Sequence, residues 1–180
     1  MDEIFSDFEL VKVNDTLNYI LQKLTKNGYI LDKSYYILDI YMINKNILDS
    51  ENSFNRLKEV PDYLILRDYN NDKKEILLFN NEAIKGKLQG LFTTKYIVQN
   101  LGYEQMFNIN KDIYFYTNGN NIITIVDIKD IGIHIDKSSI DETIENLSFD
   151  YSNEENNDYI NKAFLEYLDN RKRGNVWRIF

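Results

Sequence analysis

The most regular alternation of apolar and polar positions lies in residues 111–136, KDIYFYTNGNNIITIVDIKDIGIHID. Residues 113–117 and 121–126 are rich in Ile, Tyr, Phe, Thr and Val, which favour strands. Asn118 and Gly119 lie between them and supply the positive φ angles that a short hairpin turn needs. The pattern therefore predicts a β-hairpin, followed by one more strand over residues 132–136.

Before this hairpin, the spacing of apolar residues is typical of strands in some segments and of helices in others. Strand composition recurs over residues 8–13, 35–43, 63–67 and 75–79. A first helix is predicted to begin at Asn14 or Asp15, both good capping residues, and to end at Asn27 and Gly28. Its predicted apolar face consists of Leu17, Ile20, Leu21 and Leu24. The polar stretch 85–93 is expected to be a connection or a lid-like loop.

Two helices are predicted near the carboxyl end. Ser139 is expected to cap a short helix over residues 140–147. After an acidic stretch, a longer helix is predicted with one apolar face, made of Tyr159, Ile160, Ala163, Phe164, Tyr167 and Leu168.

Part of the first half of the chain recurs in the second half. Residues 19–24, YILQKL, match residues 96–101, YIVQNL, and each segment precedes a Gly-Tyr pair, at 28–29 and 102–103. The tripeptide Asp-Ile-Tyr then occurs at 39–41 and at 112–114. These matches predict two pseudo-symmetric halves. The alternative is a chance resemblance in a chain so rich in Ile, Tyr and Asn.

Together the elements predict an α+β fold. We expect an antiparallel β-barrel or a strongly curved sheet, built of two pseudo-symmetric halves with flanking helices and a C-terminal helix. Residues 1–149 are predicted to form the barrel domain. Residues 150–180 are predicted to supply an acidic linker, the C-terminal helix and an apolar tail, packed on the same domain. A chain of 180 residues is long enough to form such a core without disulfides or metal.

The composition narrows the classes of function. A formal net charge of −8 opposes binding to phosphate backbones, so we expect no direct nucleic-acid binding. The chain has no cysteine and, in this sequence, neither a secretory signal nor an apolar run long enough to cross a membrane, which makes the cytoplasm the expected compartment. The sequence contains no P-loop, nucleophile elbow, zinc spacing or dinucleotide-binding glycine motif.

The order of these elements resembles that of the CYTH superfamily over residues 8–138. The resemblance rests on a strand, a helix and a strand, the run YLILRD, a second helix that ends in Leu-Gly-Tyr, a hairpin, and the strand at 132–136. That superfamily includes triphosphate tunnel metalloenzymes, thiamine triphosphatases and class IV adenylyl cyclases. It implies a barrel of two related halves whose tunnel holds divalent metal with acidic residues and triphosphate with Lys and Arg.

Few of the superfamily's motif residues occur here. The opening E-x-E-x-K strand face keeps only Lys12, since Glu9 lies on the other face, and the L-R-x-R element keeps only Arg67. The strand that should end in lysine reads LLFN at 77–80, and residues 83–88 lack the expected Arg and acids. Asp127 is one position from the expected aspartate, and the final G-x-F-x-E-x-E motif keeps one acid, Asp136.

We therefore expect a small polar cluster suited to an anionic ligand, made of Lys12, Arg67, Lys111, His134 and Asp136. No residue is assigned a catalytic or metal-binding role. His134 and Asp136 share a strand face and could form a metal or acid–base pair, but a packed histidine is the favoured interpretation. Asp39 and Asp112, matched in the repeat, could face each other across the pseudo-axis, but aspartates at strand starts are more often turn formers, which is the favoured interpretation. The tail residues Trp177, Ile179 and Phe180 are candidates for binding a partner.

The leading functional hypothesis is a non-catalytic binding or interaction protein that acts on another protein, for instance a phage or mobile-element inhibitor of a bacterial nucleic-acid machine. One alternative is a divergent triphosphatase or nucleotide cyclase, which alone would need divalent metal. A second alternative is a sensor that holds a nucleotide or polyphosphate without turning it over. No other cofactor is expected. Turnover with magnesium or manganese would favour the enzyme, and stabilisation by ligand would favour the sensor.

Overall fold

The computed structural model describes residues 10–49, 63–69, 74–79, 83–87, 90–136, 147–152 and 158–172. The contacts divide the chain into two compact units. Unit 1 consists of residues 1–37 and 110–158, and unit 2 consists of residues 38–109 and 159–180. The boundary predicted after residue 149 stays a prediction.

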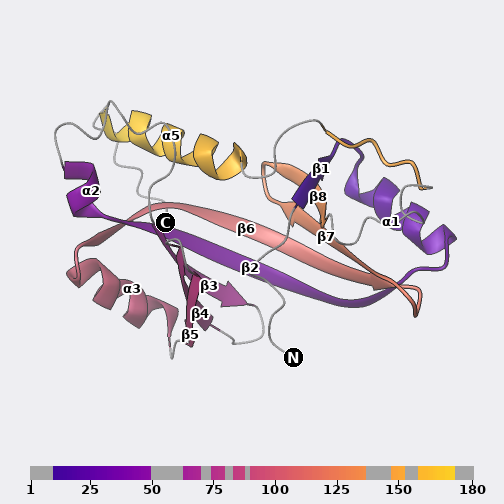
Figure 1. Ribbon diagram of the computed structural model, residues 1–180, viewed down its shortest axis with the longest axis horizontal. Coiled ribbons are helices and arrows are strands. Elements are labelled where there is room, and N and C mark those ends of the chain that lie inside the picture. The colour runs from indigo at the N-terminus through magenta and orange to yellow at the C-terminus, as the bar shows by residue number, and fades with distance from the viewer. Residues whose placement is uncertain are drawn as a thin grey trace. The chain divides into compact units, whose positions relative to one another are not determined.

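The described elements are strands interrupted by helices, and two long strands, β2 and β6, run beside each other (Figure 1). The strands are β1 (Leu10–Val13), β2 (Ile30–Asn44), β3 (Tyr63–Tyr69), β4 (Lys74–Phe79), β5 (Ala83–Lys87), β6 (Tyr103–Thr117), β7 (Ile122–Ile128) and β8 (Gly132–Asp136). The helices are α1 (Leu17–Lys26), α2 (Lys45–Asp49), α3 (Leu91–Asn100) and α5 (Asp158–Lys172). The connection predicted over residues 85–93 is partly wrong, because β5 and the start of α3 occupy much of it. The helix predicted over residues 140–147 lies almost wholly outside the described residues.

The strands form a sheet in the order β1-β8-β7-β6-β2-β3-β4-β5. Every pairing whose register is described is antiparallel, which confirms an α+β fold with an antiparallel sheet and flanking helices. The predicted barrel is not confirmed: its closure would need a pairing between β1 and β5, which end the strand order. Outward from the central β6–β2 pair, the strand order is β7, β8 and β1 on one side and β3, β4 and β5 on the other.

The predicted hairpin is confirmed as β6 and β7, which pair from Lys111 with Ile128 to Thr117 with Ile122. Its turn is longer than predicted, because the strands end at Thr117 and resume at Ile122. Within it only Gly119 has a positive φ, of 90°. The amide nitrogens of Asn120 and Asn121 both donate to Asn118 Oδ1, at 3.0 and 2.8 Å, so the Asn118 side chain holds the turn.

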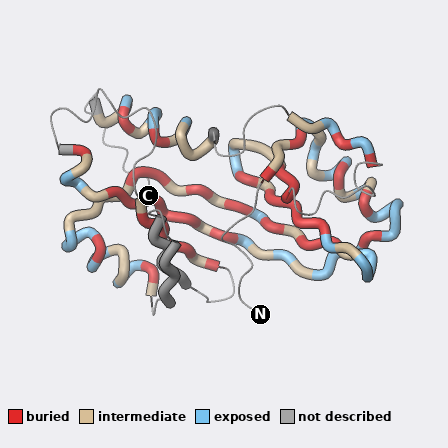
Figure 2. Tube along the Cα trace, viewed as in Figure 1, coloured by how far each residue is buried: buried red, intermediate tan, exposed pale blue. Residues whose placement is uncertain are grey.

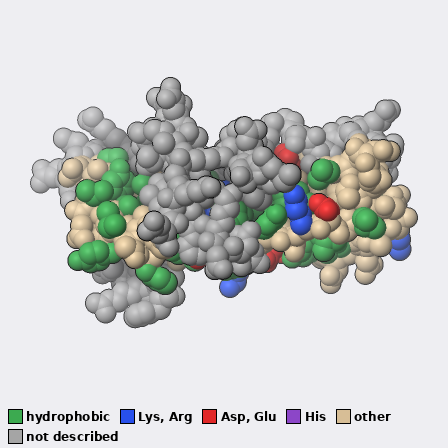
Figure 3. Space-filling view, turned by 90° about the horizontal axis from the view of Figure 1, so that it is seen from below, with side chains coloured by type: hydrophobic (Ala, Val, Ile, Leu, Met, Phe, Trp, Pro, Cys, Tyr) green, Lys and Arg blue, Asp and Glu red, His purple; other side chains and the backbone are tan. Residues whose placement is uncertain are grey.

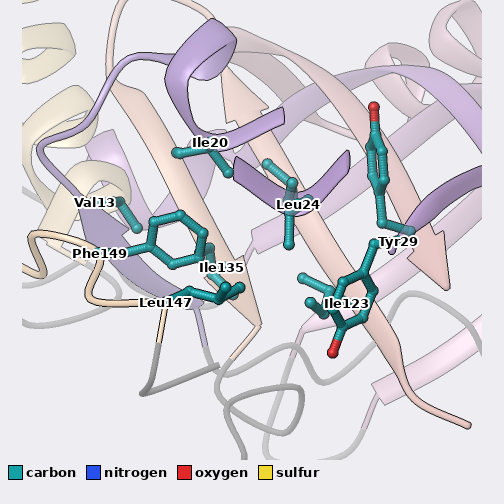
Figure 4. Close-up of a cluster of buried hydrophobic side chains, with 10 residues drawn as sticks. Val13, Ile20, Leu24, Tyr29, Ile123, Ile135, Leu147 and Phe149 are labelled. Atoms are coloured by element: carbon teal, nitrogen blue, oxygen red, sulfur yellow. The ribbon is translucent and has the colours of Figure 1, made fainter. Parts of the chain in front are cut away.

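The core of unit 1 lies between α1 and one face of the strands (Figure 4). Ile20 and Leu24, one turn apart on α1, belong to one buried cluster with Ile123 of β7 and Ile135 of β8. The helix begins one or two residues later than predicted, because Thr16 is the cap: its hydroxyl oxygen accepts from the Tyr19 amide at 3.4 Å.

Unit 2 has its own buried clusters. Leu91 and Val98 of α3 pack with Ile40 and Met42 of β2 and with Leu64 and Leu66 of β3. On α5, the predicted apolar face is confirmed for Phe164 and Leu168, which are buried (Figure 2). Glu104 of β6 accepts hydrogen bonds from Tyr167 and Arg171 of α5. None of the described helices is both long and apolar enough to cross a membrane.

The internal repeat has a structural counterpart with a different register. The helices α1 and α3 have 10 residues each, the strands β2 and β6 have 15 each, and Gly28 and Gly102 between them have φ of 84° and 95°. When the two glycines are matched, buried Leu24 corresponds to buried Val98. The predicted match of Leu24 with Leu101 is wrong, because Leu101 is exposed. The sequence repeat within the helices is therefore out of register with the structural one by about one helical turn.

Candidate functional site

In unit 1, the strand face away from α1 carries buried polar side chains. Successive strand residues point to opposite faces, so Val13, Ile133 and Ile135 pack towards α1 while their neighbours Lys12 and His134 point the other way. Lys12 lies directly opposite His134, and Leu10 directly opposite Asp136. Lys111, Thr124, His134 and Asp136 are all buried.

His134 experiences both lysines of this face. Burial lowers its pKa below the ordinary value of 6.5, and the positive charges of Lys12 and Lys111 lower it further. Hydrogen bonds to the backbone of Gly132 and Val126 act in the opposite direction, with Nδ1 lying 3.1 Å from the Gly132 carbonyl oxygen. We call Lys12, Lys111 and His134 the basic cluster. It places two lysines and a histidine on one strand face, which also carries the Asp136 carboxylate.

Gly132 makes room for one member of the basic cluster. A Cβ atom at this position would lie 3.4 Å from Lys12 Cε, and the backbone has a φ of 130°. A larger residue would therefore be strained by this φ and would bring its Cβ into contact with the lysine side chain. The glycine that resembles the superfamily's final motif thus supports the placement of Lys12.

In unit 2, Arg67 is held by an acidic side chain that the sequence did not predict as its partner. Arg67 Nε donates to Asp39 Oδ1 at 2.6 Å, and Arg67 Nη2 donates to Asp39 Oδ2 at 2.8 Å. Arg67 is 5% exposed and Asp39 0%. Burial opposes the charge of Arg67, but the Asp39 carboxylate and Tyr69 outweigh it and raise the pKa of the guanidinium.

Aromatic residues surround this ion pair. The Tyr41 ring lies with its centroid 4.8 Å from that of Phe107 and 5.4 Å from that of Tyr63. Burial, with the charges of Tyr159 and Asp39, raises the pKa of Tyr63 to about 12. The Asp39–Arg67 pair therefore lies among buried and half-buried tyrosines of β2 and β3.

The five predicted ligand-binding residues belong to two different units. The structure brings Lys12, Lys111 and His134 together in unit 1, with Asp136 on the same strand face as His134. Arg67 lies in unit 2 with Asp39. The predicted partner-binding residues Trp177, Ile179 and Phe180 lie outside the described residues.

The interpretation of Asp39 and Asp112 as turn formers is wrong. Both are within long strands, and Asp39 is buried while Asp112 is exposed. Asp39 lies one residue further along the chain from Gly28 than Asp112 does from Gly102. A shift of one residue along a strand places the side chain on the other face of the sheet. This offset was visible in the sequence and could have predicted their different roles.

Asp112 lies directly opposite Asp127 on the strand face that carries α1. Burial and the charge of Asp112 raise the pKa of Asp127. Asp127 is therefore on the opposite face of the sheet from Lys12 and does not contribute to the basic cluster. Among the described residues, no group of three or more His, Asp or Glu side chains could hold a metal ion.

The fold is similar to several solved structures. A candidate adenylate cyclase from Vibrio parahaemolyticus superposes with a TM-score of 0.53 at 12% identity, covering 84% of this chain and 95% of its own. The PH1819 protein of Pyrococcus horikoshii OT3 gives 0.55 at 15% identity, covering 93% and 99%. The PH1012 protein of the same organism gives 0.51 at 16% identity, covering 91% and 90%.

No protein family and no curated protein matches the chain by sequence. At such low identities, the structural likenesses show the fold alone.

Proposed function

We propose that this chain is a non-catalytic binding protein built on a CYTH-like fold, and that the basic cluster of unit 1 binds an anion of the nucleotide or polyphosphate class. The observation that carries the proposal is the buried Asp39–Arg67 pair. Arg67 donates two hydrogen bonds to the Asp39 carboxylate, whose negative charge offsets that of the guanidinium inside the protein. A clamp for a transferring phosphoryl group needs an arginine whose charge faces the substrate.

The basic cluster supports the binding half of the proposal. Lys12 and Lys111 place two positive charges beside a histidine whose pKa they lower. A bound phosphate oxygen would offset those charges and favour protonation of His134. The described part of this face does not suit a divalent metal, because it offers two metal-ligating side chains, Asp136 and His134, beside two lysines. Metal chemistry is therefore not part of the proposed function.

Thermal unfolding with tripolyphosphate and nucleoside triphosphates tests the proposal. A ligand at about 100 times its Kd stabilises by about 2.7 kcal/mol, which for a chain of this size raises Tm by roughly 5–10 °C. The shift should be lost in Lys12→Ala and Lys111→Ala and kept in Lys129→Ala, an exposed lysine of the same unit. Unchanged melting temperatures across a broad anion panel would exclude the anion site.

The one histidine of the chain gives an independent readout. Binding of an anion at the basic cluster should raise the pKa of His134, as followed by the ring signals in an NMR titration. An anion that stabilises the protein without moving this pKa would bind somewhere else.

A second candidate is a divergent triphosphatase or nucleotide cyclase, favoured by the likeness to the candidate adenylate cyclase. Such an enzyme would draw its metal ligands from outside the basic cluster. Turnover of triphosphate with magnesium or manganese distinguishes the two candidates. Activity that is abolished by Lys12→Ala would refute the non-catalytic proposal, and stabilisation by ligand without turnover would refute the enzyme.

A further inference from the structure

Residues 147–152 lie beside β1, at the end of the strand order (Figure 1). Val13 of β1 forms an antiparallel bridge with Tyr151. The Ser152 amide nitrogen donates to the Lys12 carbonyl oxygen at 2.8 Å. We call residues 147–152 the strap. Within the described residues, the backbone of β1 is therefore bonded on one side by β8 and on the other by the strap.

Side chains anchor the strap on unit 1 (Figure 4). Leu147 and Phe149 are buried in the same apolar cluster as Val13. Lys23 of α1 holds the residue between them, because its Nζ donates to the Ser148 carbonyl oxygen at 3.3 Å. The same Nζ lies 5.3 Å from the centroid of the Phe149 ring, within the range of a cation–π contact. The strap is therefore part of the packed structure of unit 1.

Two more hydrogen bonds fix the strap to the residues between β1 and α1. The Asn14 amide nitrogen donates to the Asp150 carbonyl oxygen at 2.8 Å. In return, the Asp150 amide nitrogen donates to Asp15 Oδ2 at 2.9 Å. Since Thr16 caps α1, the Asp15 carboxylate can serve the strap without weakening the start of the helix.

The strap affects the basic cluster through Lys12. β1 has four residues, and so short a strand is held in place mainly by its neighbours. The Lys12 side chain passes over Gly132, where an added Cβ would lie 3.4 Å from Lys12 Cε, and its charge reaches His134. A displaced β1 would move this lysine away from the cluster.

The accuracy of that placement matters because the basic cluster has few lysines. On the face of the molecule seen in Figure 3, the lysine and arginine side chains of the described residues are scattered and form no patch. The basic cluster itself combines Lys12 and Lys111 with one histidine. With two lysines, the affinity for an anion depends on how well each one is held.

We propose that the strap positions Lys12, so that the basic cluster binds its anion tightly only while residues 147–152 are paired with β1. The ligand part of this inference rests on the proposed function. The placement of Lys12 does not, and it can be measured in the protein without ligand.

Ser152→Pro tests the proposal, because proline has no amide hydrogen to donate to the Lys12 carbonyl. Ser152→Ala is the matched control, since it keeps that amide. In the free protein, Ser152→Pro should raise the pKa of His134 towards 6.5, as followed by NMR of the ring signals, because a displaced Lys12 no longer lowers it. In calorimetric titrations, Ser152→Pro should also weaken tripolyphosphate binding by at least about tenfold.

A double variant separates positioning from a general loosening of the fold. In the Lys12→Met background, Ser152→Pro should leave the pKa of His134 unchanged, because the lysine through which the strap acts is absent. A rise of the same size in that background would overturn the proposal, as would an effect of Ser152→Ala equal to that of Ser152→Pro. So would an unchanged His134 pKa in folded Ser152→Pro.

A second site keeps the test decisive if Ser152→Pro does not fold. Asp15→Ala removes the acceptor of the Asp150 amide, and Asp15→Asn keeps an oxygen there. Asp15→Ala should raise the pKa of His134 and Asp15→Asn should restore it, whereas equal values in both would overturn the proposal. A wild-type protein that binds no tripolyphosphate would refute the proposed function alone, and the His134 titrations would still decide whether the strap positions Lys12.

Discussion

Replacing Asp39 and Arg67 singly and together should separate a structural ion pair from a ligand-binding arginine. We consider the variants Arg67→Met, Asp39→Leu and the double variant, which keep the side-chain volume similar while removing charge. Neither residue contacts solvent to any useful extent, because Arg67 is 5% exposed and Asp39 0%. Each single change therefore leaves one buried charge without its partner.

The magnitude follows from that burial. Removing one partner of a buried ion pair costs about 3–5 kcal/mol, whereas replacing both with apolar residues is close to neutral. Each single variant should lose that amount from a total stability of about 5–15 kcal/mol, with Tm lower by roughly 6–20 °C. The double variant should be more stable than either single one. The loss in Arg67→Met should also shrink at acidic pH, because protonation neutralises the isolated carboxylate.

Urea unfolding of all four proteins, analysed as a double-mutant cycle, measures the coupling between the two residues. We expect a coupling energy of at least about 2 kcal/mol. Losses that simply add in the double variant would refute the pair as a structural unit. A loss of affinity for tripolyphosphate in the double variant, with its stability retained, would instead give Arg67 a role in binding.

Three further changes have expected outcomes. His134→Gln should reduce the loss of stability that occurs as the pH falls below 6.5, because the lowered pKa of His134 means that the unfolded chain binds this proton at a higher pH than the folded protein does. Unfolding free energies measured between pH 5 and 8 would show the smaller pH dependence, and the same slope in both proteins would contradict the prediction. Leu24→Ala should lower the free energy of unfolding by about 2–5 kcal/mol in urea, because Leu24 is fully buried on the inner side of α1. A loss below about 1 kcal/mol would show that Leu24 does not contribute to the core. Gly102→Ala should lower the free energy of unfolding by about 1–2 kcal/mol. The φ of 95° at this position is strained for alanine, although no atom lies within 4 Å of the added Cβ. An unchanged Tm would refute this strain.

Local patterns predicted most of the described fold, because the signals were local. Alternation and the Asn118-Gly119 pair identified the β6–β7 hairpin, and helical spacing identified the buried face of α1. The start of α1 was misplaced because Asn14, Asp15 and Thr16 are all competent caps, and only the structure shows which one accepts the amide. Whether the sheet closes depends on a contact between its first and last strands, which no local pattern encodes.

The positions of the polar residues followed from the sequence only in part. Lys12 and His134 were named from their motif positions, and the register of adjacent strands brings them directly opposite each other. Arg67 was also named, but its partner was not, because Asp39 is distant in sequence and follows an Ile-Tyr-rich strand pattern. The exposure of Ile97 and Leu101 was not predicted, because the sequence repeat aligned them with Ile20 and Leu24, which are buried.

The strands β2 and β6 each begin in one unit and end in the other. Neither unit is therefore a continuous piece of chain, and no single cut can release one of them whole. The outer pairing of Leu10 with Asp136 joins residues that are far apart in sequence, so the closing contacts of unit 1 form only after most of the chain has been synthesised. We expect slow folding dominated by non-local pairing, with both units ordering in one cooperative step that stopped-flow refolding would record as a single phase.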